Sequence, residues 1–545
     1  MKRSYRCLFA AAASPSSPPP PLARTMKKTR DLYCVHVPDA PAPPPGVPSH
    51  GWRITITKEE ADLLNVVKET REHFKMKTLP RVAGGWVRDK LLEKFSHDLD
   101  IALDDCSGEE FANKVNEYLE SKGEATKTVG VIKANPEQSK HLATATVKIH
   151  GREVDFVNLR SETYEGDSRI PKIEIGTPQQ DAERRDFTVN SMFYNVLTGQ
   201  VEDLTGKGLQ DLANGVLRTP LSASITFRDD PLRMLRGIRF AARYGFRLDE
   251  ELCSALADPH NSAALETKVS NERVGIELDK SLKGERPKLA LELIIAHNLA
   301  DAVFKVPKER FIDERPQLPA RVDWLTGLRI VEAMAKRLGS NAEHLPEPTA
   351  VYIAAVLFPL TVSQFTVKKG KKEPVVKHIV LNSLKLGNHT AERVYSIVAA
   401  ATALSEFMVR GEIAEERVEL GRLLFEVKDA WHDGLLISLS ALQAGRAFSK
   451  DEDEYINNAV ARAEQIKKRI SVDWKLDCIW EKLQKDPILD GTELMAFLKI
   501  KGAEVRKAVS LVRDFAFLNG HPEDSQDRDV SVARAKEYVL KHWSK

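Results

Sequence analysis

The hydrophobic pattern of this chain changes near Arg218 from short strands to long helices, and this change constrains the fold most strongly. Upstream of it, apolar runs of strand length are separated by turns, at 79–83, near Ile101 and at 147–156. Downstream of Pro231, longer stretches carry apolar residues at helical spacing, among them 289–303, 391–408 and 418–442. The pattern predicts an α+β fold in which a small mixed-sheet head precedes a mostly α-helical remainder.

Length and composition indicate a globular chain of several domains. Its 545 residues are 42% hydrophobic, which is enough for about three or four domains with their own cores. The 81 Lys and Arg residues nearly balance the 79 Asp and Glu residues, so nucleic-acid binding would depend on local basic surface. The five cysteines are scattered without zinc-like spacing, and no apolar run is long enough to span a membrane. We therefore expect neither a disulfide framework, nor a zinc site, nor a membrane segment.

The first 50 residues differ in composition from the rest of the chain. Residues 1–30 are rich in Arg, Lys, Ala, Ser and Pro and contain no acid, and the first acidic residue is Asp31. This composition is typical of an organelle transit peptide, although a disordered Pro-rich leader without targeting information looks the same. A transit peptide would direct the protein to mitochondria or plastids. Translation from Met26 would instead leave a cytoplasmic or nuclear form.

Three aspartates on predicted strands suggest a metal site. Asp98 and Asp100 are two residues apart, so on a strand both carboxylates point to the same face. Asp155 lies in another strand-like run and is a candidate third acid. Mg²⁺ binds a few carboxylates and keeps positions for substrate phosphates. Such a site can activate an attacking hydroxyl and stabilise a leaving pyrophosphate, whereas an exposed strand end is the alternative explanation for the Asp-x-Asp pattern alone.

A glycine pair precedes these acids. Gly84-Gly85 opens a predicted helix over about 87–94, and Arg88 lies in its first turn. Glycine lets the backbone approach a triphosphate, and a helix N-terminus favours the negative charge of such a group. A plain tight turn is the alternative interpretation of the same two residues.

Five segments, in sequence order, resemble the motifs of class II CCA-adding tRNA nucleotidyltransferases of the eukaryotic, plant- or fungal-like kind. That family is part of the nucleotidyltransferase superfamily related to DNA polymerase beta. The segments are Gly84–Asp89 with Asp98–Ala102, Arg184–Met192, Asp203–Leu212 with Leu217-Arg218, Arg228–Arg236, and Glu272–Leu278. The match is dense over about 79–282, and the C-terminal half resembles the family only weakly.

The resemblance implies an enzyme that adds CCA to the 3′ end of tRNA from CTP and ATP, without a template, and releases pyrophosphate. It implies Mg²⁺ at Asp98 and Asp100, with Asp155 as a third catalytic acid. Asp186 and Asn190 would brace the site rather than touch substrate. Seven residues would bind the incoming nucleotide: Gly85, Arg88, Arg185, Asp230, Arg233, Arg236 and Arg239.

In this family, protein side chains select the nucleobase, and the residues here suit that task. The Asp230 carboxylate can accept a hydrogen bond from the exocyclic amine of cytosine or adenine, and Arg233 can donate to a neighbouring acceptor. Uracil and guanine carry a carbonyl in place of that amine and would leave buried polar groups unpaired. Asp230, Arg233, Arg236 and Arg239 recur every three residues and would form one helical ridge, for which a solvated basic face is the alternative.

The expected domains are a leader (1–50), a catalytic head (51–218), a helical neck that selects the nucleotide (219–285) and a helical body and tail that bind tRNA (286–545). The sequence departs from the family pattern at Asp229, where Glu is usual, and at Glu93, where many relatives carry Gly. Three other functions stay open at this point. They are a poly(A) polymerase of the same family, an enzyme that adds only CC or only A, and a tRNA-binding protein that has lost catalysis.

Overall fold

A computed structural model describes residues 54–96, 98–126, 128–132, 144–163, 171–306, 328, 347–360, 364–366, 372–409, 417–438, 452–521 and 528–543. The predicted leader, including Met26, lies outside these described residues. Two compact units follow one another along the chain, with their boundary between Val303 and Phe304, and each is described by itself.

The first unit contains a seven-stranded mixed sheet, which confirms the predicted mixed-sheet head. The strand order is β3-β4-β5-β2-β1-β8-β9, and only β2 and β5 run parallel, whereas every other neighbouring pair is antiparallel. The strands are β1 (Arg81–Ala83), β2 (Asp100–Leu103), β3 (Gly130–Ile132), β4 (Thr144–Ile149), β5 (Arg152–Asn158), β8 (Phe193–Asn195) and β9 (Gln200–Glu202).

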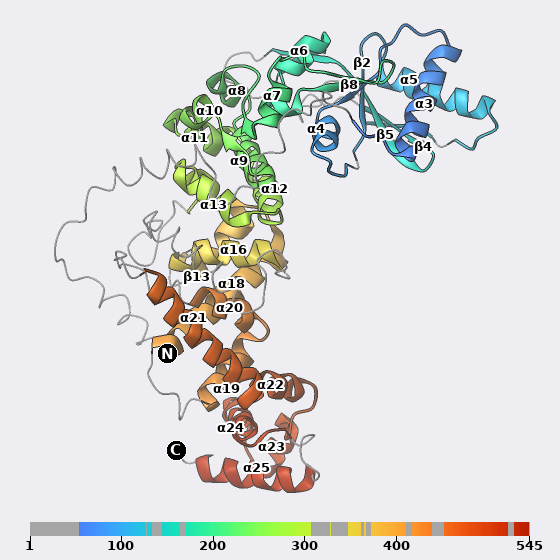
Figure 1. Cartoon of the computed structure of the whole chain (residues 1–545). Helices are drawn as coiled ribbons and strands as arrows, with labels where there is room; N and C mark the ends of the chain where they lie inside the picture. The colour runs from blue at the N-terminus through green and yellow to red at the C-terminus, as the bar shows by residue number, and fades with distance from the viewer. Residues whose placement is uncertain are drawn as a thin grey trace, which may run out of the picture. The chain divides into compact units, whose positions relative to one another are not determined.

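Helices cover this sheet and close its core. Helices α3 (Lys58–His73) and α5 (Gly108–Ser121) pack together, and α5 also packs on β4 and β5 (Figure 1). The rings of Phe111 and Phe156, both fully buried, lie 5.1 Å apart between α5 and the sheet. The remaining elements around the sheet are α4 (Gly85–Leu91), β6 (Arg160–Thr163), β7 (Lys172–Ile175), α6 (Pro178–Glu183), the 3-10 helix η2 (Thr188–Asn190) and α7 (Gly208–Ala213).

Helix α4 begins and ends earlier than the predicted range of 87–94. It begins at Gly85, directly after Gly84, whose φ of 64° lies in the left-handed region that glycine adopts easily. It ends at Leu91 because Glu93 also has a positive φ, 56°, and the amide of Lys94 bonds the Asp89 carbonyl across this turn.

The rest of the first unit is helical, except for the short parallel pair β10 (Val216–Leu217) and β11 (Arg247–Leu248). Helix α9 (Leu232–Tyr244) is amphipathic: its apolar side, including Met234 and Ile238, is fully buried. It packs against α12 (Asn271–Leu282) and α13 (Pro287–Ala296), as Figure 1 shows. The other helices are α8 (Ala223–Asp229), α10 (Glu250–Leu256), α11 (Pro259–Lys268) and α14 (Ala300–Val303).

The second unit, from Phe304 onward, is mostly helical, as predicted. Helices α18 (Gly387–Val409) and α20 (Ala430–Ser438) pack so closely that a Cβ on Gly434 would lie 2.5 Å from the Ala400 Cβ. No helix among the described residues has the length and apolar character needed to cross a membrane. The elements are α16 (Pro348–Leu357), η4 (Phe358–Leu360), β12 (Gln364–Thr366), β13 (Lys372–Pro374), α17 (Val375–His378), η6 (Ile379–Ser383), α18 (Gly387–Val409), α19 (Arg417–Val427), α20 (Ala430–Ser438), α21 (Glu452–Lys468), η8 (Arg469–Asp473), α22 (Leu476–Lys485), α23 (Gly491–Leu498), α24 (Ala503–Asn519) and α25 (Arg528–Trp543).

Candidate active site

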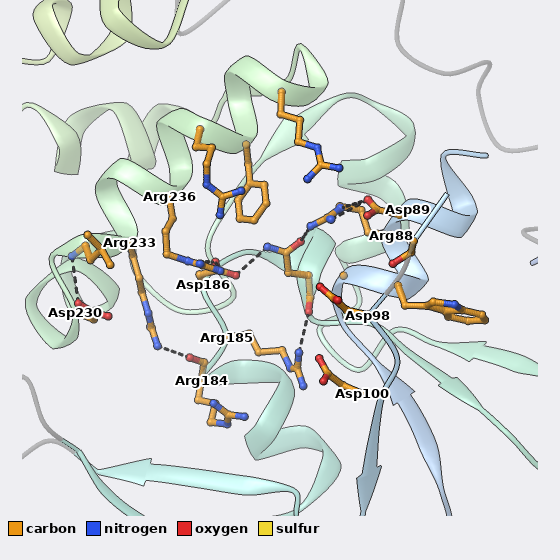
Figure 2. Close-up of a pocket in the computed structure, with 18 of the residues that line it drawn as sticks. Arg88, Asp89, Asp98, Asp100, Arg184, Arg185, Asp186, Asp230, Arg233 and Arg236 are labelled. Atoms are coloured by element: carbon orange, nitrogen blue, oxygen red, sulfur yellow. Dashed lines mark hydrogen bonds and ion pairs between the residues drawn. The ribbon is translucent and has the colours of Figure 1, made fainter. Parts of the chain in front are cut away.

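A polar pocket of about 520 Å³ lies between the sheet and helix α9 in the first unit. Nine of the ten site residues expected from the sequence line it, and the tenth, Asp155, does not. Figure 2 shows the labelled aspartates and arginines converging on this space from separate elements. The lining consists of Gly85, Trp86, Arg88, Asp89, Ser96, Asp98, Asp100, Arg184, Arg185, Asp186, Asn190, Asp230, Leu232, Arg233, Arg236, Arg239, Phe240, Arg243 and Arg273.

The two predicted metal-binding carboxylates face this pocket. Asp100 is the first residue of β2, and Asp98 precedes the strand by two positions, so both reach the same space (Figure 2). Asp155 stands beside Asp100 as its partner in the parallel β2–β5 pair, and its Oδ1 accepts a 2.5 Å hydrogen bond from Thr146. The three acids are thus neighbours, but Asp155 is turned toward β4 rather than toward the pocket.

Negative charge is concentrated where these acids meet. Asp100 is exposed as a residue, but the surrounding protein partly shields its carboxylate from water, and this desolvation raises its pKa. The nearby carboxylates of Asp155 and Asp98 raise the pKa further. Arg185 acts in the opposite direction and favours the charged form of Asp100. A bound cation would relieve this repulsion, so the donor set fits a divalent metal.

The described residues contain no group of three or more His, Cys, Asp or Glu side chains arranged to hold a metal ion. Asp98 and Asp100 offer two carboxylates, which leaves coordination positions of a bound ion open to substrate phosphates and water. Mg²⁺ commonly binds in this way, through one or two carboxylates together with substrate phosphates and water.

Arg88 lines the pocket next to these acids, and Gly84 lies against Arg185, which lines it too. Gly84 has φ 64°, and a Cβ there would lie 2.5 Å from Arg185 Nη1, so any larger residue would displace that guanidinium. The buried Arg88 side chain bonds Asp89 at 2.8 Å and the amide oxygen of Asn190, and its guanidinium lies over the Tyr244 ring. These contacts hold the Arg88 cation rigidly at the edge of the pocket.

Asp186 and Asn190 brace the site. Asn190 Nδ2 donates to Asp186 Oδ1 at 2.9 Å, and Arg236 Nη2 lies 2.7 Å from Asp186 Oδ2. Burial opposes ionisation of Asp186, but the Arg236 charge and these hydrogen bonds prevail and lower its pKa to about 2. Asp186 is therefore a fixed anion that orients Arg236.

The predicted ridge is helical only from Arg233 to Arg239, because Asp230 is an extended residue after α8 and lies before α9. The side chains of all four residues are already engaged by neighbours. Asp230 Oδ2 accepts a 2.8 Å bond from Arg273 Nη2, and Arg233 Nη2 donates to the Arg184 carbonyl at 2.7 Å. Arg239 Nε lies 2.7 Å from Glu277 Oε2, and the same carboxylate lies 3.6 Å from Arg236. The partners of this ridge come from the loop after α6 and from α12.

The sequence did not single out these partners. Arg273 and Glu277 fall within the fifth motif, Glu272–Leu278, to which no role was given. Glu162 on β6 lies 2.8 Å from Arg184 and 3.7 Å from Arg233, and nothing in its local sequence signals this contact. The fifth motif was the one available signal, because Arg273 and Glu277 are four residues apart and share a helix face.

Comparison with known families agrees with this geometry. The family model described as "Poly A polymerase head domain" matches residues 80–218, which include the sheet, Asp98 and Asp100. A second model, "Probable RNA and SrmB-binding site of polymerase A", matches residues 245–314.

Curated relatives extend the match over most of the chain. The "CCA tRNA nucleotidyltransferase, mitochondrial" of Saccharomyces cerevisiae is 39% identical over 427 residues, which cover 71% of this chain and 78% of the relative. The chain belongs to the CCA tRNA nucleotidyltransferase family. The "tRNA nucleotidyltransferase cca2" of Schizosaccharomyces pombe is 32% identical and is matched over 99% of its length, with 89% of this chain.

Solved structures show that the fold is that of the family. A CCA-adding enzyme in an apo form superposes with a TM-score of 0.57 at 19% identity, covering 89% of this chain and 96% of that one. The Thermotoga maritima CCA-adding enzyme complexed with tRNA superposes with a TM-score of 0.55 at 17% identity, with the same coverage. Members of the family are metal-dependent nucleotidyltransferases.

Proposed function

We propose that this protein adds CCA to the 3′ end of tRNA from CTP and ATP, without a nucleic-acid template, and releases pyrophosphate. The observation that carries the proposal is one pocket holding both an Asp98/Asp100 carboxylate pair and an Asp230/Arg233 pair. The first pair suits phosphoryl chemistry and the second suits recognition of a base edge. Relatives named CCA tRNA nucleotidyltransferase, 34–39% identical over most of the chain, support the same activity.

In this proposal the cation is Mg²⁺, held by Asp98 and Asp100. When bound, it would supply activation of the attacking hydroxyl and stabilisation of the leaving pyrophosphate. Asp155 is the Cα partner of Asp100 in the parallel β2–β5 pair, and it acts as the third catalytic acid by adding negative charge beside that ligand. Catalysis then consists mainly of positioning and of charge stabilisation in the pocket.

The arginines of the pocket bind the triphosphate and the base. Arg88 and Arg185 lie close to Gly84-Gly85 and to the carboxylate pair, and this proximity supports a role in binding the phosphates. Arg236 and Arg239, held by Asp186 and Glu277, present oriented N–H groups along α9. Gly85 leaves the backbone open to close approach by the nucleotide.

The Asp230/Arg233 pair selects cytosine and adenine. Each carboxylate oxygen has two lone pairs, so Asp230 can keep its bond to Arg273 and still accept one from an exocyclic amine. Arg233 has five N–H groups, of which Nη2 serves the Arg184 carbonyl and the others can face a base. A base with a carbonyl in place of the amine would face the Asp230 carboxylate without a donor and would be rejected.

The domain roles follow the expected division, with a catalytic head at 51–218, a selecting neck at 219–285 and a tRNA-binding body and tail at 286–545. Residues 1–50 act as a transit peptide for mitochondria or plastids, and translation from Met26 yields a cytoplasmic and nuclear form. The basic, acid-free composition of residues 1–30 and relatives named as mitochondrial enzymes support this localisation. Imaging of a fluorescent protein fused to residues 1–50 tests it.

An extension assay tests the activity. Transfer RNA lacking its terminal CCA is incubated with the full chain, MgCl₂ and CTP, ATP or both, and product lengths are resolved on a gel. Growth by one CCA that needs both nucleotides and then stops supports the proposal. A long ladder with ATP alone would identify a poly(A) polymerase, addition of CC or A alone a partial enzyme, and no extension a catalytically inactive tRNA-binding protein.

A further inference from the structure

A second hollow, of about 540 Å³, lies beside the active-site pocket in the first unit. It is bounded by the C-terminal end of α9, by the end of α12 and by the loop that follows α12. Asp98, Arg239 and Arg243 line both hollows, so the two are continuous at a catalytic carboxylate. The full lining is Asp98, Arg239, Ala242, Arg243, Lys280, Ser281, Lys283, Gly284, Glu285 and Arg286.

The lining is predominantly basic, and two of its cations have no carboxylate partner in the part of the chain that the structure describes. Arg239 is held by Glu277, and Lys283 lies 2.7 Å from Asp279. Among the described residues, neither Arg243 nor Lys280 forms an ion pair, although Arg243 lies over the Tyr244 ring at 5.2 Å. Their charges are therefore available to an anion that enters the hollow.

Arg286 shapes the hollow rather than offering its charge. Its Nη1 donates to the carbonyls of Ala242 and Arg243 at 3.1 and 3.2 Å, which caps the C-terminal end of α9. The carboxylate of Glu285 lies 3.6 Å from Arg286 and 3.1 Å from Lys94, so it is also engaged. The backbone at Arg243 is thereby held at the C-terminal end of α9, the helix that also carries Arg233 of the active-site pocket.

The position of the hollow limits what it binds. Arg233 and Arg243 are ten residues apart on α9, which corresponds to about 15 Å along the helix axis. In nucleotidyl transfer, the attacking hydroxyl must approach the metal-binding carboxylates from outside the triphosphate site. A strand whose terminal 3′ hydroxyl reaches Asp98 through the second hollow would place its preceding phosphodiester beside Arg243 and Lys280.

We propose that this second hollow binds the backbone phosphates of the RNA strand immediately before its reactive 3′ hydroxyl, through Arg243 and Lys280. The inference rests on the proposed function, because it assumes an RNA 3′ end as the acceptor. It assigns RNA contacts to the region before residue 286, in addition to those expected of the helical body and tail. A phosphate contact of this kind positions the strand without reading its sequence.

The test compares a double variant, Arg243→Gln with Lys280→Gln, with a control, Lys77→Gln with Arg247→Gln. The control removes one exposed lysine and one exposed arginine that lie outside both hollows. Extension rates of tRNA lacking CCA give KM for RNA and KM for CTP separately. Binding of the same tRNA at several salt concentrations gives the salt dependence of affinity.

We expect the double variant to raise KM for RNA by roughly tenfold or more, with KM for CTP within about twofold of wild type. Loss of two phosphate contacts should also reduce the slope of log affinity against log salt by about 1.4, at about 0.7 per contact on single-stranded RNA. The charge-retaining pair Arg243→Lys with Lys280→Arg should recover part of the RNA affinity that the double variant loses, because phosphate binding depends on positive charge. The control should change neither KM.

Unchanged RNA binding in the double variant would overturn the inference, and so would a raised KM for CTP alone, which would assign the hollow to a nucleotide. A wild-type chain that fails to add CCA would defeat the proposed function instead, so the two failures are distinguishable.

A second measurement uses the unaltered chain: acetylation of Lys280 with an N-hydroxysuccinimide ester, followed by mass spectrometry. We expect tRNA, but not CTP, to protect Lys280, and lack of protection by tRNA would also overturn the inference.

Discussion

Arg273 on α12 donates a 2.8 Å hydrogen bond to Asp230, which follows α8 directly and lines the active-site pocket. The two residues are 43 positions apart in the chain, and both line the same pocket. This bond fixes one carboxylate oxygen of Asp230, while the amide of Leu232 donates to the other at 3.2 Å. In the proposed function, selection of the base by Asp230 therefore depends on a residue outside the motif that contains Asp230.

Replacement of Arg273 by Ala should weaken base discrimination. Asp230 would rotate more freely, so the hydrogen bond to an exocyclic amine would lose about 1–3 kcal/mol of its selectivity, or roughly ten- to a hundredfold in the CTP-to-UTP ratio of kcat/KM. Single-nucleotide incorporation into tRNA lacking CCA measures this ratio. Arg273→Lys should retain part of it, and the exposed Arg247→Ala should retain all of it. An unaltered ratio in Arg273→Ala would show that the bond does not orient Asp230.

Removal of either metal-binding carboxylate should stop catalysis but not RNA binding. Asp98→Asn and Asp100→Asn each remove a charged ligand worth several kcal/mol of transition-state stabilisation, so extension should slow by roughly a thousandfold or more. Filter binding of tRNA should change little, because the RNA is held by other groups. Asp301→Asn, an exposed acid outside the pocket, is the matched control. Extension at the wild-type rate in both pocket variants would show that the metal site lies elsewhere.

Local sequence was sufficient to predict much of the fold and of the site. The three-residue spacing of Arg233, Arg236 and Arg239 places them on one ridge of α9, which is helical because its opposite side is apolar. The predicted place of Asp230 on this ridge is wrong, because Asp230 is an extended residue that lies before the helix. The spacing of Asp98 and Asp100 likewise brings both to one space, although only Asp100 lies within the strand.

What the sequence could not predict depends on contacts between distant elements. Glu162 and Arg273 acquire their roles because β6 and α12 meet α9 in the folded unit, and no local period encodes those encounters. The turn of Asp155 toward Thr146 depends on the β4–β5 register for the same reason. Helix α4 ends before Lys94 because Glu93 adopts a positive φ, which composition alone does not reveal.

The stability contributed by Asp186 should disappear in acid. Its pKa is lowered to about 2 from an ordinary value of 3.8, so its contribution is complete above pH 4 and is lost as the pH falls toward 2. A shift of this size corresponds to about 2 kcal/mol. The difference in unfolding free energy between wild type and Asp186→Asn, measured in urea at a series of pH values, should shrink by about this amount on acidification. A difference that stays constant from pH 5 to the lowest accessible pH would contradict the assignment of Asp186 as a fixed anion.

Glu93→Gly should stabilise the protein. Glu93 is exposed and has φ 56°, a conformation that costs a residue with a Cβ about 1–2 kcal/mol and costs glycine little. Part of this gain is offset because glycine has more freedom in the unfolded chain, so the net increase should be about 0.5–1 kcal/mol. Thermal or urea unfolding measures the change, and extension activity should be retained because Glu93 does not line the pocket.

Glu93→Ala keeps the Cβ and the strained φ, so it should leave stability within about 0.5 kcal/mol of wild type. Equal stabilities of Glu93→Gly and Glu93→Ala would show that the turn after α4 carries no such strain.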